Sequence, residues 1–248
     1  IMALFQGPKI VTDGLAICLD AADKNCYPGS GTSVTDLTAN GNNMVLKNGA
    51  SVLSDNTINF DGVNDYSNIG SDSTWKTGTI SIMVWAYAAN WAAYASDNKR
   101  LYSCTEAGGW NMCVGVAGSA NGSFTVNDLG VFVYADSQYN LVSIALSSIP
   151  SGWNHFTVTV STSVVTLYMN GTSVDTQSKT GSGEIAYNAS NSLLFGAEAG
   201  SGTTPAASGF NYLDGVIGPF MLYNRPLSDK EVHQNFTAQR SRFNSGLL

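Results

Sequence analysis

The sequence predicts an all-β fold that ends in one helix, and three observations support this prediction. Short β-type runs separated by turn residues follow one another from residue 15 to residue 223. Charged residues make up only 12% of the chain and glycines number 26, a composition that suits strands and turns better than ion-paired helices. A capping box over residues 228–231 gives the one clear signal for a helix.

Successive side chains of a strand point to opposite faces, so alternate residues of each predicted strand show what lies on either side of it. Both faces of residues 79–87 are largely apolar, so this strand is expected to be central and covered on both sides. Asn170-Gly171 is the strongest hairpin signal, because a type I′ turn needs two residues with positive φ. In chain order the strands are residues 15–19, 57–60, 79–87, 100–105, 111–116, 130–134, 141–146, 153–160, 164–169, 192–196 and 212–223.

The helix is expected over about residues 228–240. Ser228 and Glu231 are the two ends of the capping box, and Val232 and Phe236 follow it at helical spacing. The acidic residues of this segment are therefore interpreted as helix-capping groups.

The chain is expected to form an N-terminal arm, residues 1–13, and one domain, residues 14–248. No internal repeat, long linker or change of composition divides the domain, and single β-sandwiches commonly reach this length. The arm has enough apolar surface to dock on a neighbouring molecule. Its apolar residues include Leu4, Phe5, Ile10 and Val11.

The first residues bear on where the natural chain starts. Residues 4–8 match the cleavage site of a viral 3C protease. Because cleavage there would leave Gly7 as the first residue, we expect Met2 to be the natural start.

Charge and hydropathy exclude two classes of partner. The net charge is −7 and the isoelectric point is about 4.6, whereas binding to a phosphate backbone depends on clustered Lys and Arg. The longest apolar run covers residues 82–89, well short of a membrane span. We therefore expect no nucleic-acid partner and no membrane insertion.

A series of short motifs extends from about Gly14 to Phe236. They lie at residues 14–15, 19–21, 27–32, 36–43, 60–66, 80–85, 153–158, 167–171, 213–217 and 222–228. Together they resemble the concanavalin A-like lectin/glucanase superfamily in its laminin-G-like branch. The resemblance implies a jelly-roll sandwich of two antiparallel sheets. The sequence departs from the family pattern at two positions. Val34 stands where the family often has Trp, and Gly218 stands where an acidic residue often follows the position of Ile217.

Catalysis by the glucanases of this superfamily needs two carboxylates beside the scissile bond, usually as Glu-x-Asp-x-x-Glu on one strand. None of the four Glu residues belongs to such a run. Asp229 and Glu231 are the only acidic pair two residues apart, and they lie in the helix cap. His155 and His233 have no paired nucleophile in view and are interpreted as packing or surface residues. We expect no enzymatic activity.

The resemblance also raises the question of calcium, which laminin-G-like domains often hold on loops at the rim of the sandwich. Asp61, Asn64 and Asp65 lie in one turn and Asp214 would be a fourth oxygen ligand. The favoured interpretation is that these side chains accept hydrogen bonds from backbone amides around Gly62. No cofactor is therefore expected, and calcium is the alternative.

Two cysteines are predicted to lie across a hairpin. Gly108-Gly109 fits a two-residue turn between strands 100–105 and 111–116. Counting outward from this turn places Cys104 opposite Cys113 as a non-hydrogen-bonded pair, where side chains approach closely enough for a disulfide. The redox state of the compartment decides whether the bond forms.

Five aromatic residues are candidates for sugar binding, because a pyranose has an apolar face and a ring of hydroxyls. Trp91, Tyr94 and Trp110 lie in polar stretches outside the clearest strands, and Tyr134 and Tyr139 flank another polar loop. Packing of these rings against a neighbouring subunit is an equally supported alternative.

The segment from Pro8 to Leu15, with residues 27–32, is most similar to jelly-roll domains of phage virion proteins. This similarity implies a non-enzymatic structural or adhesion protein of the capsid-decoration or tail-fibre type, located on the virion surface. Its partners would be other virion proteins, copies of itself and host-surface glycans. The alternative is a stand-alone or secreted, extracellular lectin that binds glycan, with or without calcium.

Overall fold

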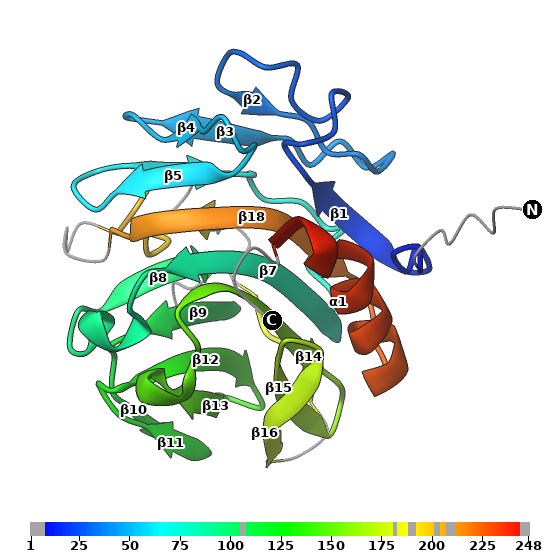
Figure 1. The fold of residues 1–248 in the computed structure, drawn as a ribbon. Helices are drawn as coiled ribbons and strands as arrows, with labels where there is room; N and C mark the ends of the chain where they lie inside the picture. The colour runs from blue at the N-terminus through cyan, green and yellow to red at the C-terminus, as the bar shows by residue number, and fades with distance from the viewer. Residues whose placement is uncertain are drawn as a thin grey trace, which may run out of the picture.

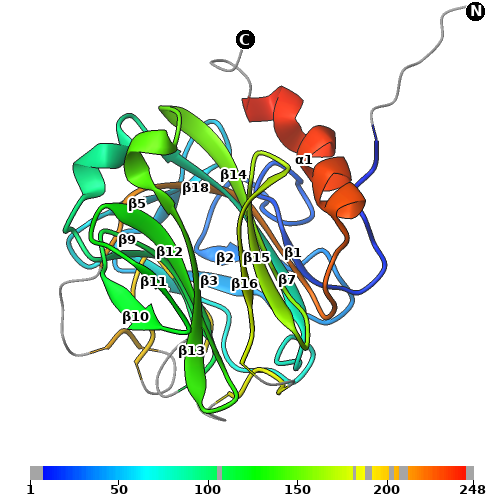
Figure 2. The ribbon, with the colours of Figure 1, turned by 90° about the horizontal axis from the view of Figure 1, so that it is seen from below.

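The computed structural model describes residues 8–104, 108–180, 183–187, 192–200, 204–206 and 212–243. Within these ranges the chain forms two antiparallel sheets, a small separate hairpin and one helix, α1 (Asp229–Phe243). Figure 2 shows the two sheets edge-on, with α1 outside one of them. The predicted sandwich with a C-terminal helix is confirmed.

The first sheet, called sheet A, has the strand order β16-β15-β14-β7-β18-β5-β4, with β1 also pairing with β18. The middle strand β7 is buried along almost its whole length, as its two apolar faces predict. Asn170 and Gly171 have φ of 51° and 78°, as the predicted turn between β15 and β16 requires. The strands are β1 (Leu15–Leu19), β4 (Ser51–Val52), β5 (Ile58–Asp61), β7 (Ile80–Ala88), β14 (Gly152–Val160), β15 (Val164–Met169), β16 (Thr172–Ser178) and β18 (Asp214–Tyr223).

The second sheet, called sheet B, has the order β13-β12-β9-β8-β17-β6-β3-β2, and the hairpin β10-β11 stands beside it. The predicted strand over residues 192–196 contains β17, but β2, β3 and β6 were not predicted, because two to four residues carry too little alternation to be recognised. The strands are β2 (Ser33–Val34), β3 (Met44–Lys47), β6 (Tyr66–Asn68), β8 (Lys99–Ser103), β9 (Trp110–Val114), β12 (Asp128–Ala135), β13 (Gln138–Ala145), β17 (Leu194–Phe195), β10 (Gly118–Ala120) and β11 (Gly122–Phe124). Two 3-10 helices, η1 (Trp91–Tyr94) and η2 (Leu146–Ser148), complete the fold.

The main core lies between the two sheets. Alternate residues of each strand point into it, and large aromatic side chains fill it. Its largest fully buried members include Trp75, Trp110, Tyr102, Phe60, Phe156, Phe195 and Phe220.

The helix α1 covers part of the outer face of sheet A (Figure 1). It begins as the capping box predicts: the backbone N–H of Ser228 donates to Glu231 Oε2 at 2.8 Å, and the Glu231 N–H donates to Ser228 Oγ at 3.4 Å. The Arg225 guanidinium also pairs with Glu231 and holds the pKa of this carboxyl at about 2. No helix of the described chain is long and apolar enough to cross a membrane.

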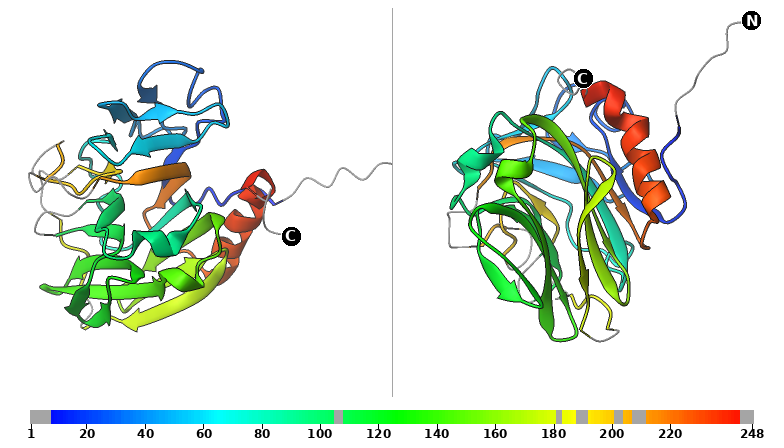
Figure 3. Two further views of the ribbon diagram at one scale, coloured as in Figure 1. Left: turned by 60° about the vertical axis from the view of Figure 1, so that its left-hand side comes forward. Right: turned by 60° about the horizontal axis from the view of Figure 1, so that its bottom comes forward.

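The described part of the N-terminal arm lies against its own domain (Figure 3). The N–H of Val11 donates to Asn235 Oδ1 of α1 at 2.7 Å, and Tyr223 donates its hydroxyl to the Val11 carbonyl at 2.9 Å. Ile10 and Val11 pack with the cluster of apolar residues under α1. Ile10 and Val11 thus lose part of their exposed surface to this domain, while docking of the arm on a neighbour stays a prediction; Leu4 and Phe5 lie outside the described residues.

Candidate functional site

Two of the five aromatic candidates are core residues. Trp110 is the first residue of β9 and is fully buried, with Nε1 donating to the Tyr187 hydroxyl at 3.2 Å. Trp91 begins η1, is 3% exposed, and meets the Phe156 ring at 5.4 Å between centroids. A buried ring offers no face to a sugar, so the assignment of Trp91 and Trp110 to a binding site is wrong.

Tyr94 anchors η1 to sheet A. Its hydroxyl donates to the backbone carbonyl of Asp214 at 2.5 Å. Burial and the nearby carboxylates of Asp214 and Asp97 raise the pKa of Tyr94 to about 12. The hydroxyl is thus a neutral donor in a structural contact and is not available to a ligand.

Tyr134 and Tyr139 form the candidate site, because they remain half-buried and lie together. They are direct cross-strand partners in β12 and β13, with ring centroids 5.0 Å apart in a T-shaped arrangement. The two strands are joined by Asp136 and Ser137, whose φ values of 54° and 63° fit a type I′ turn. The turn fixes the register and therefore the contact between the two rings.

Two phenylalanines extend the pair into a ladder of aromatic rings. Phe132 meets Tyr139 at 5.8 Å, and Phe124 of β11 meets Phe132 at 4.8 Å, both as T-shaped pairs. Phe124 is buried and Phe132 half-buried, so the ladder runs from a covered base to an accessible tip. Sequence reasoning missed these two residues, although Phe132 and Tyr134 lie two apart and therefore on one face of β12.

Polar groups flank the turn that carries the tyrosines. Oδ2 of Asp136 is buried and has no hydrogen-bond partner. The Lys179 ammonium donates to the carbonyl of Ser161 at 3.3 Å and to that of Gly183, and its burial lowers the pKa of Lys179. Lys179 is itself buried and already bonded to these carbonyls, so these polar groups stabilise the surroundings of the turn and leave the two tyrosine rings as the groups that can meet a ligand.

The carboxylates considered for calcium close a turn. Asp61 Oδ1 accepts the N–H groups of Val63 at 2.8 Å and Asn64 at 3.4 Å, and these bonds lower the pKa of Asp61. Asp65 is 2% exposed, accepts the N–H of Asp61 at 3.2 Å, and has its pKa raised by burial and by the Asp61 charge. Asp214 is the cross-strand partner of Asp61. These hydrogen bonds are those of the predicted turn. The described residues contain no group of three His, Cys, Asp or Glu side chains able to hold a metal ion.

The predicted disulfide is wrong. Cys104 and Cys113 are free, and Cys113 pairs with Arg100 across β8 and β9, while the N–H of Cys104 donates to the carbonyl of Trp110. Cys104 packs in the main core, whereas Cys113 packs in a separate cluster on the other face of sheet B. Strand β8 ends at Ser103 and β9 begins at Trp110, so the connection is longer than the predicted two-residue turn and Ser103 lies opposite Asn111.

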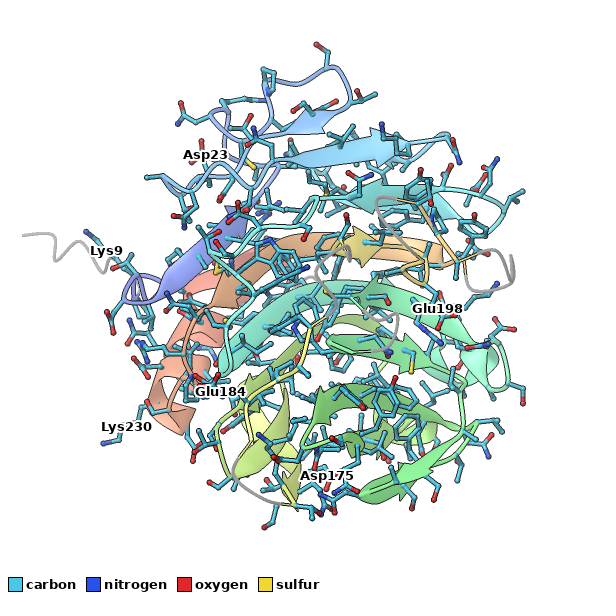
Figure 4. The ribbon with its side chains drawn as sticks, turned by 180° about the vertical axis from the view of Figure 1, so that it is seen from behind. Lys9, Asp23, Asp175, Glu184, Glu198 and Lys230 are labelled. Atoms are coloured by element: carbon cyan, nitrogen blue, oxygen red, sulfur yellow. The ribbon has the colours of Figure 1, made fainter. Side chains whose placement is uncertain are left out.

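The glutamates of the described residues lie in different parts of the fold. Glu184 and Glu198 are well separated, as Figure 4 shows, and Glu231 caps α1. Glu106 lies outside the described residues. His155 is fully buried under α1 as a packing residue.

Comparison with solved structures supports the fold. The chain resembles the binding domain of botulinum neurotoxin serotype D, with a TM-score of 0.65 and 13% identity over 92% of this chain and 52% of that one. It also resembles the binding domain of botulinum neurotoxin DC in complex with SialylT, with a TM-score of 0.63 and 13% identity over 93% and 52% of the two chains. A third similar structure is the binding domain of Paraclostridial Mosquitocidal Protein 1, with a TM-score of 0.59 and 17% identity over 90% and 52%.

The chain therefore spans about half the length of these toxin binding domains, and identities this low show the fold alone. No curated protein matches the sequence significantly. A family model described as the concanavalin A-like lectin/glucanases superfamily matches residues 61–233, most of the chain. The chain belongs to this superfamily, in its laminin-G-like branch.

Proposed function

We propose that the chain is a non-enzymatic attachment module that binds glycan through Tyr134 and Tyr139 and is displayed on the surface of a virion. The observation that carries the glycan part is the half-buried Tyr134–Tyr139 pair at the tip of a rigid hairpin. An aromatic ring provides the apolar face that a pyranose stacks on, and the hairpin holds the ring without a loss of side-chain freedom on binding.

The binding role agrees with the neighbours in fold. One of the toxin binding domains is in complex with SialylT and another with rat synaptotagmin II, so this sandwich occurs in proteins that attach to a glycan or a protein. A non-enzymatic role fits the separation of Glu184 from Glu198 (Figure 4) and the absence of the Glu-x-Asp-x-x-Glu run from the sequence.

Display on a particle would strengthen a weak site. A single sugar site of this size gives modest affinity, and many copies on one surface raise avidity by orders of magnitude without any new contact. The similarity of the N-terminal segment to phage virion domains supports a virion as that surface. The partners are then other virion proteins or copies of this chain, together with host-surface glycans.

The glycan part is tested with Tyr134→Ala and Tyr139→Ala, alone and combined, on an array of host-surface glycans. We expect the double variant to lose at least tenfold in affinity with an unchanged melting temperature. The matched control is Tyr66→Ala, because Tyr66 is also a half-buried tyrosine of sheet B but lies outside the aromatic ladder. Equal binding by the double variant and the wild type would contradict the assignment.

The virion part is tested by protein analysis of purified particles. We expect the chain in fixed stoichiometry with the other structural proteins. A monomeric, particle-free protein that binds a soluble oligosaccharide tightly would replace this proposal with the extracellular-lectin alternative.

A further inference from the structure

A second row of side chains crosses the outer face of sheet A and meets Phe243 at the C-terminal end of α1. Trp153 of β14 is the cross-strand partner of Tyr87 in β7, and Tyr87 is in turn the partner of Val216 in β18. Val216 is the partner of Asn59 in β5. Four adjacent strands therefore place these four residues side by side.

The burial of their neighbours shows that the row faces outward. Ile58 and Phe60 of β5, like Ile217 of β18, point into the main core, so Asn59 and Val216 point away from it. Tyr87 is 40% exposed, and Trp153, Val216 and Asn59 are half-buried. Within the described residues, the row therefore keeps exposed surface on the side away from the core.

The aromatic part of the row is held firmly. The Trp153 and Tyr87 rings lie 5.5 Å apart, and Trp153 also meets Phe243 at the end of α1 at 4.9 Å. The Trp153 ring is thus held in contact with both the helix and Tyr87. A ligand that stacks here meets rings already in place, which lowers the entropy lost on binding.

The polar atoms of the row are unused. Among the described residues, none donates to or accepts from the Trp153 indole N–H, the Tyr87 hydroxyl or the Asn59 amide. On the part of the same face that α1 covers, the polar atoms of the aromatic side chains do form hydrogen bonds. Trp85 donates to Gln239, and Tyr168 donates to Asp229, both on α1.

The charge around the row selects the class of ligand. Asp61 and Asp214 lie one step along the same face from Asn59 and Val216, and both are exposed. No Lys or Arg belongs to the row. Carboxylate oxygens accept hydrogen bonds from hydroxyl groups and repel anions, so the surroundings favour a neutral, hydroxyl-rich ligand over a sialylated or sulfated one.

We propose that the row Trp153–Tyr87–Val216–Asn59 is a second saccharide site, which binds a neutral oligosaccharide across the strands. Neighbouring strands are about 4.8 Å apart, so the row is about 14 Å long and accommodates more than one sugar unit. Sugar rings stack on Trp153 and Tyr87, and their hydroxyls bond to the Trp153 N–H, the Asn59 amide and the Asp214 carboxylate. This site is separate from the Tyr134–Tyr139 site and does not depend on it.

The proposal is tested by titrating the full chain with neutral cello-, xylo-, malto- and chito-oligosaccharides, followed by NMR of the tryptophan indole N–H signals. A Trp153→Phe variant assigns the Trp153 signal. We expect one of these series to shift that signal in a saturable manner, and Tyr87→Ala and Asn59→Ala each to weaken binding at least tenfold. The matched control is Val174→Ala, since Val174 is an exposed apolar residue of β16 in the same sheet, and it should bind as the wild type does.

Three results would overturn the second site. They are no shift of the Trp153 signal with any of the four series, binding that Tyr87→Ala leaves unchanged, and binding of anionic glycans alone at this row. Loss of binding in the Tyr134→Ala and Tyr139→Ala double variant but not in Tyr87→Ala would support the proposed function while rejecting this inference. The reverse pattern would reject the first site and keep the second.

Discussion

Trp85 at the centre of sheet A and Gln239 in α1 are joined by a hydrogen bond although 154 residues separate them: Nε1 of Trp85 donates to Gln239 Oε1 at 2.9 Å. The Trp85 ring stacks on Phe243 at 4.4 Å and on Phe236 at 5.8 Å, and lies 5.0 Å from the ring of His155. This contact fixes the helix over the sheet.

Removing the acceptor should loosen the helix. Gln239→Leu leaves the buried indole N–H of Trp85 without a partner, and we expect a loss of about 1–3 kcal/mol in the free energy of unfolding. Urea denaturation measures this loss of unfolding free energy. Lys230→Leu, at an exposed position of the same helix, is the control and should change stability by less than about 0.5 kcal/mol. A Gln239→Leu variant as stable as the control would show that the bond contributes nothing.

Acid should destabilise the domain through His155. Neither ring nitrogen of His155 has a hydrogen-bond partner, and burial lowers the pKa of His155 to about 3 from an ordinary value of 6.5. The unfolded chain therefore binds a proton that the folded chain does not. Stability is complete above pH 6.5 and falls as the pH drops toward 3, by up to about 1.4 kcal/mol per pH unit.

The variant His155→Phe isolates this effect. Between pH 6.5 and 4.5 its free energy of unfolding should vary less with pH than that of the wild type. Below pH 4.5 both proteins should lose the contribution of Glu231, whose pKa is held at about 2. Identical slopes for the two proteins between pH 6.5 and 4.5 would refute the role of His155.

The four cysteine thiols should be unreactive in the folded protein. All four are free and buried, and burial raises the pKa of Cys104 and Cys113 to about 12, so neither forms a thiolate at neutral pH. We expect a colorimetric thiol reagent to label almost none in the native chain and all four after unfolding in guanidinium. Two unreactive cysteines in the unfolded, unreduced chain would instead establish a disulfide.

Truncating Trp110 should damage stability, not glycan binding. The ring packs edge-on against Trp75 at 6.1 Å and Tyr102 at 5.5 Å, so Trp110→Ala should cost about 3–5 kcal/mol. Thermal unfolding measures the loss of stability. Binding is measured on the glycan array at a temperature below the melting temperature of the variant. Trp110→Phe should retain much of the packing. Trp110→Ala with normal stability and lost binding would restore this residue to a sugar site.

The sequence was sufficient to predict those features of the fold that depend on a single short segment. The capping box at Ser228–Glu231 requires only four residues, and the Asn170-Gly171 turn only two, and both are found as predicted. The two apolar faces of β7 likewise indicate that other parts of the protein cover this strand on both sides. In these cases the physical cause lies within the segment itself.

The sites were harder to predict because cross-strand register brings their residues together. Trp110 follows two glycines, yet it begins a core strand, since the residues around it say little about which way its ring points. Tyr87 and Trp153 each look like ordinary strand residues, and only the pairing of β7 with β14 makes them neighbours. The Cys104–Cys113 pairing failed for the related reason that the length of the connection between β8 and β9 sets every partner, and it places Ser103 opposite Asn111.

The position of β18 has a consequence for synthesis of the chain. This strand is the last in sequence, yet it pairs with β7, β5 and β1 inside sheet A. Until residue 223 has left the ribosome, those three strands lack this neighbour, and the nascent chain presents open edges that invite aggregation. Pairing over such a distance also gives a high contact order, which slows folding. Sheet A can therefore be completed only after β18 has been synthesised, and an mRNA truncated before β18 should yield insoluble protein.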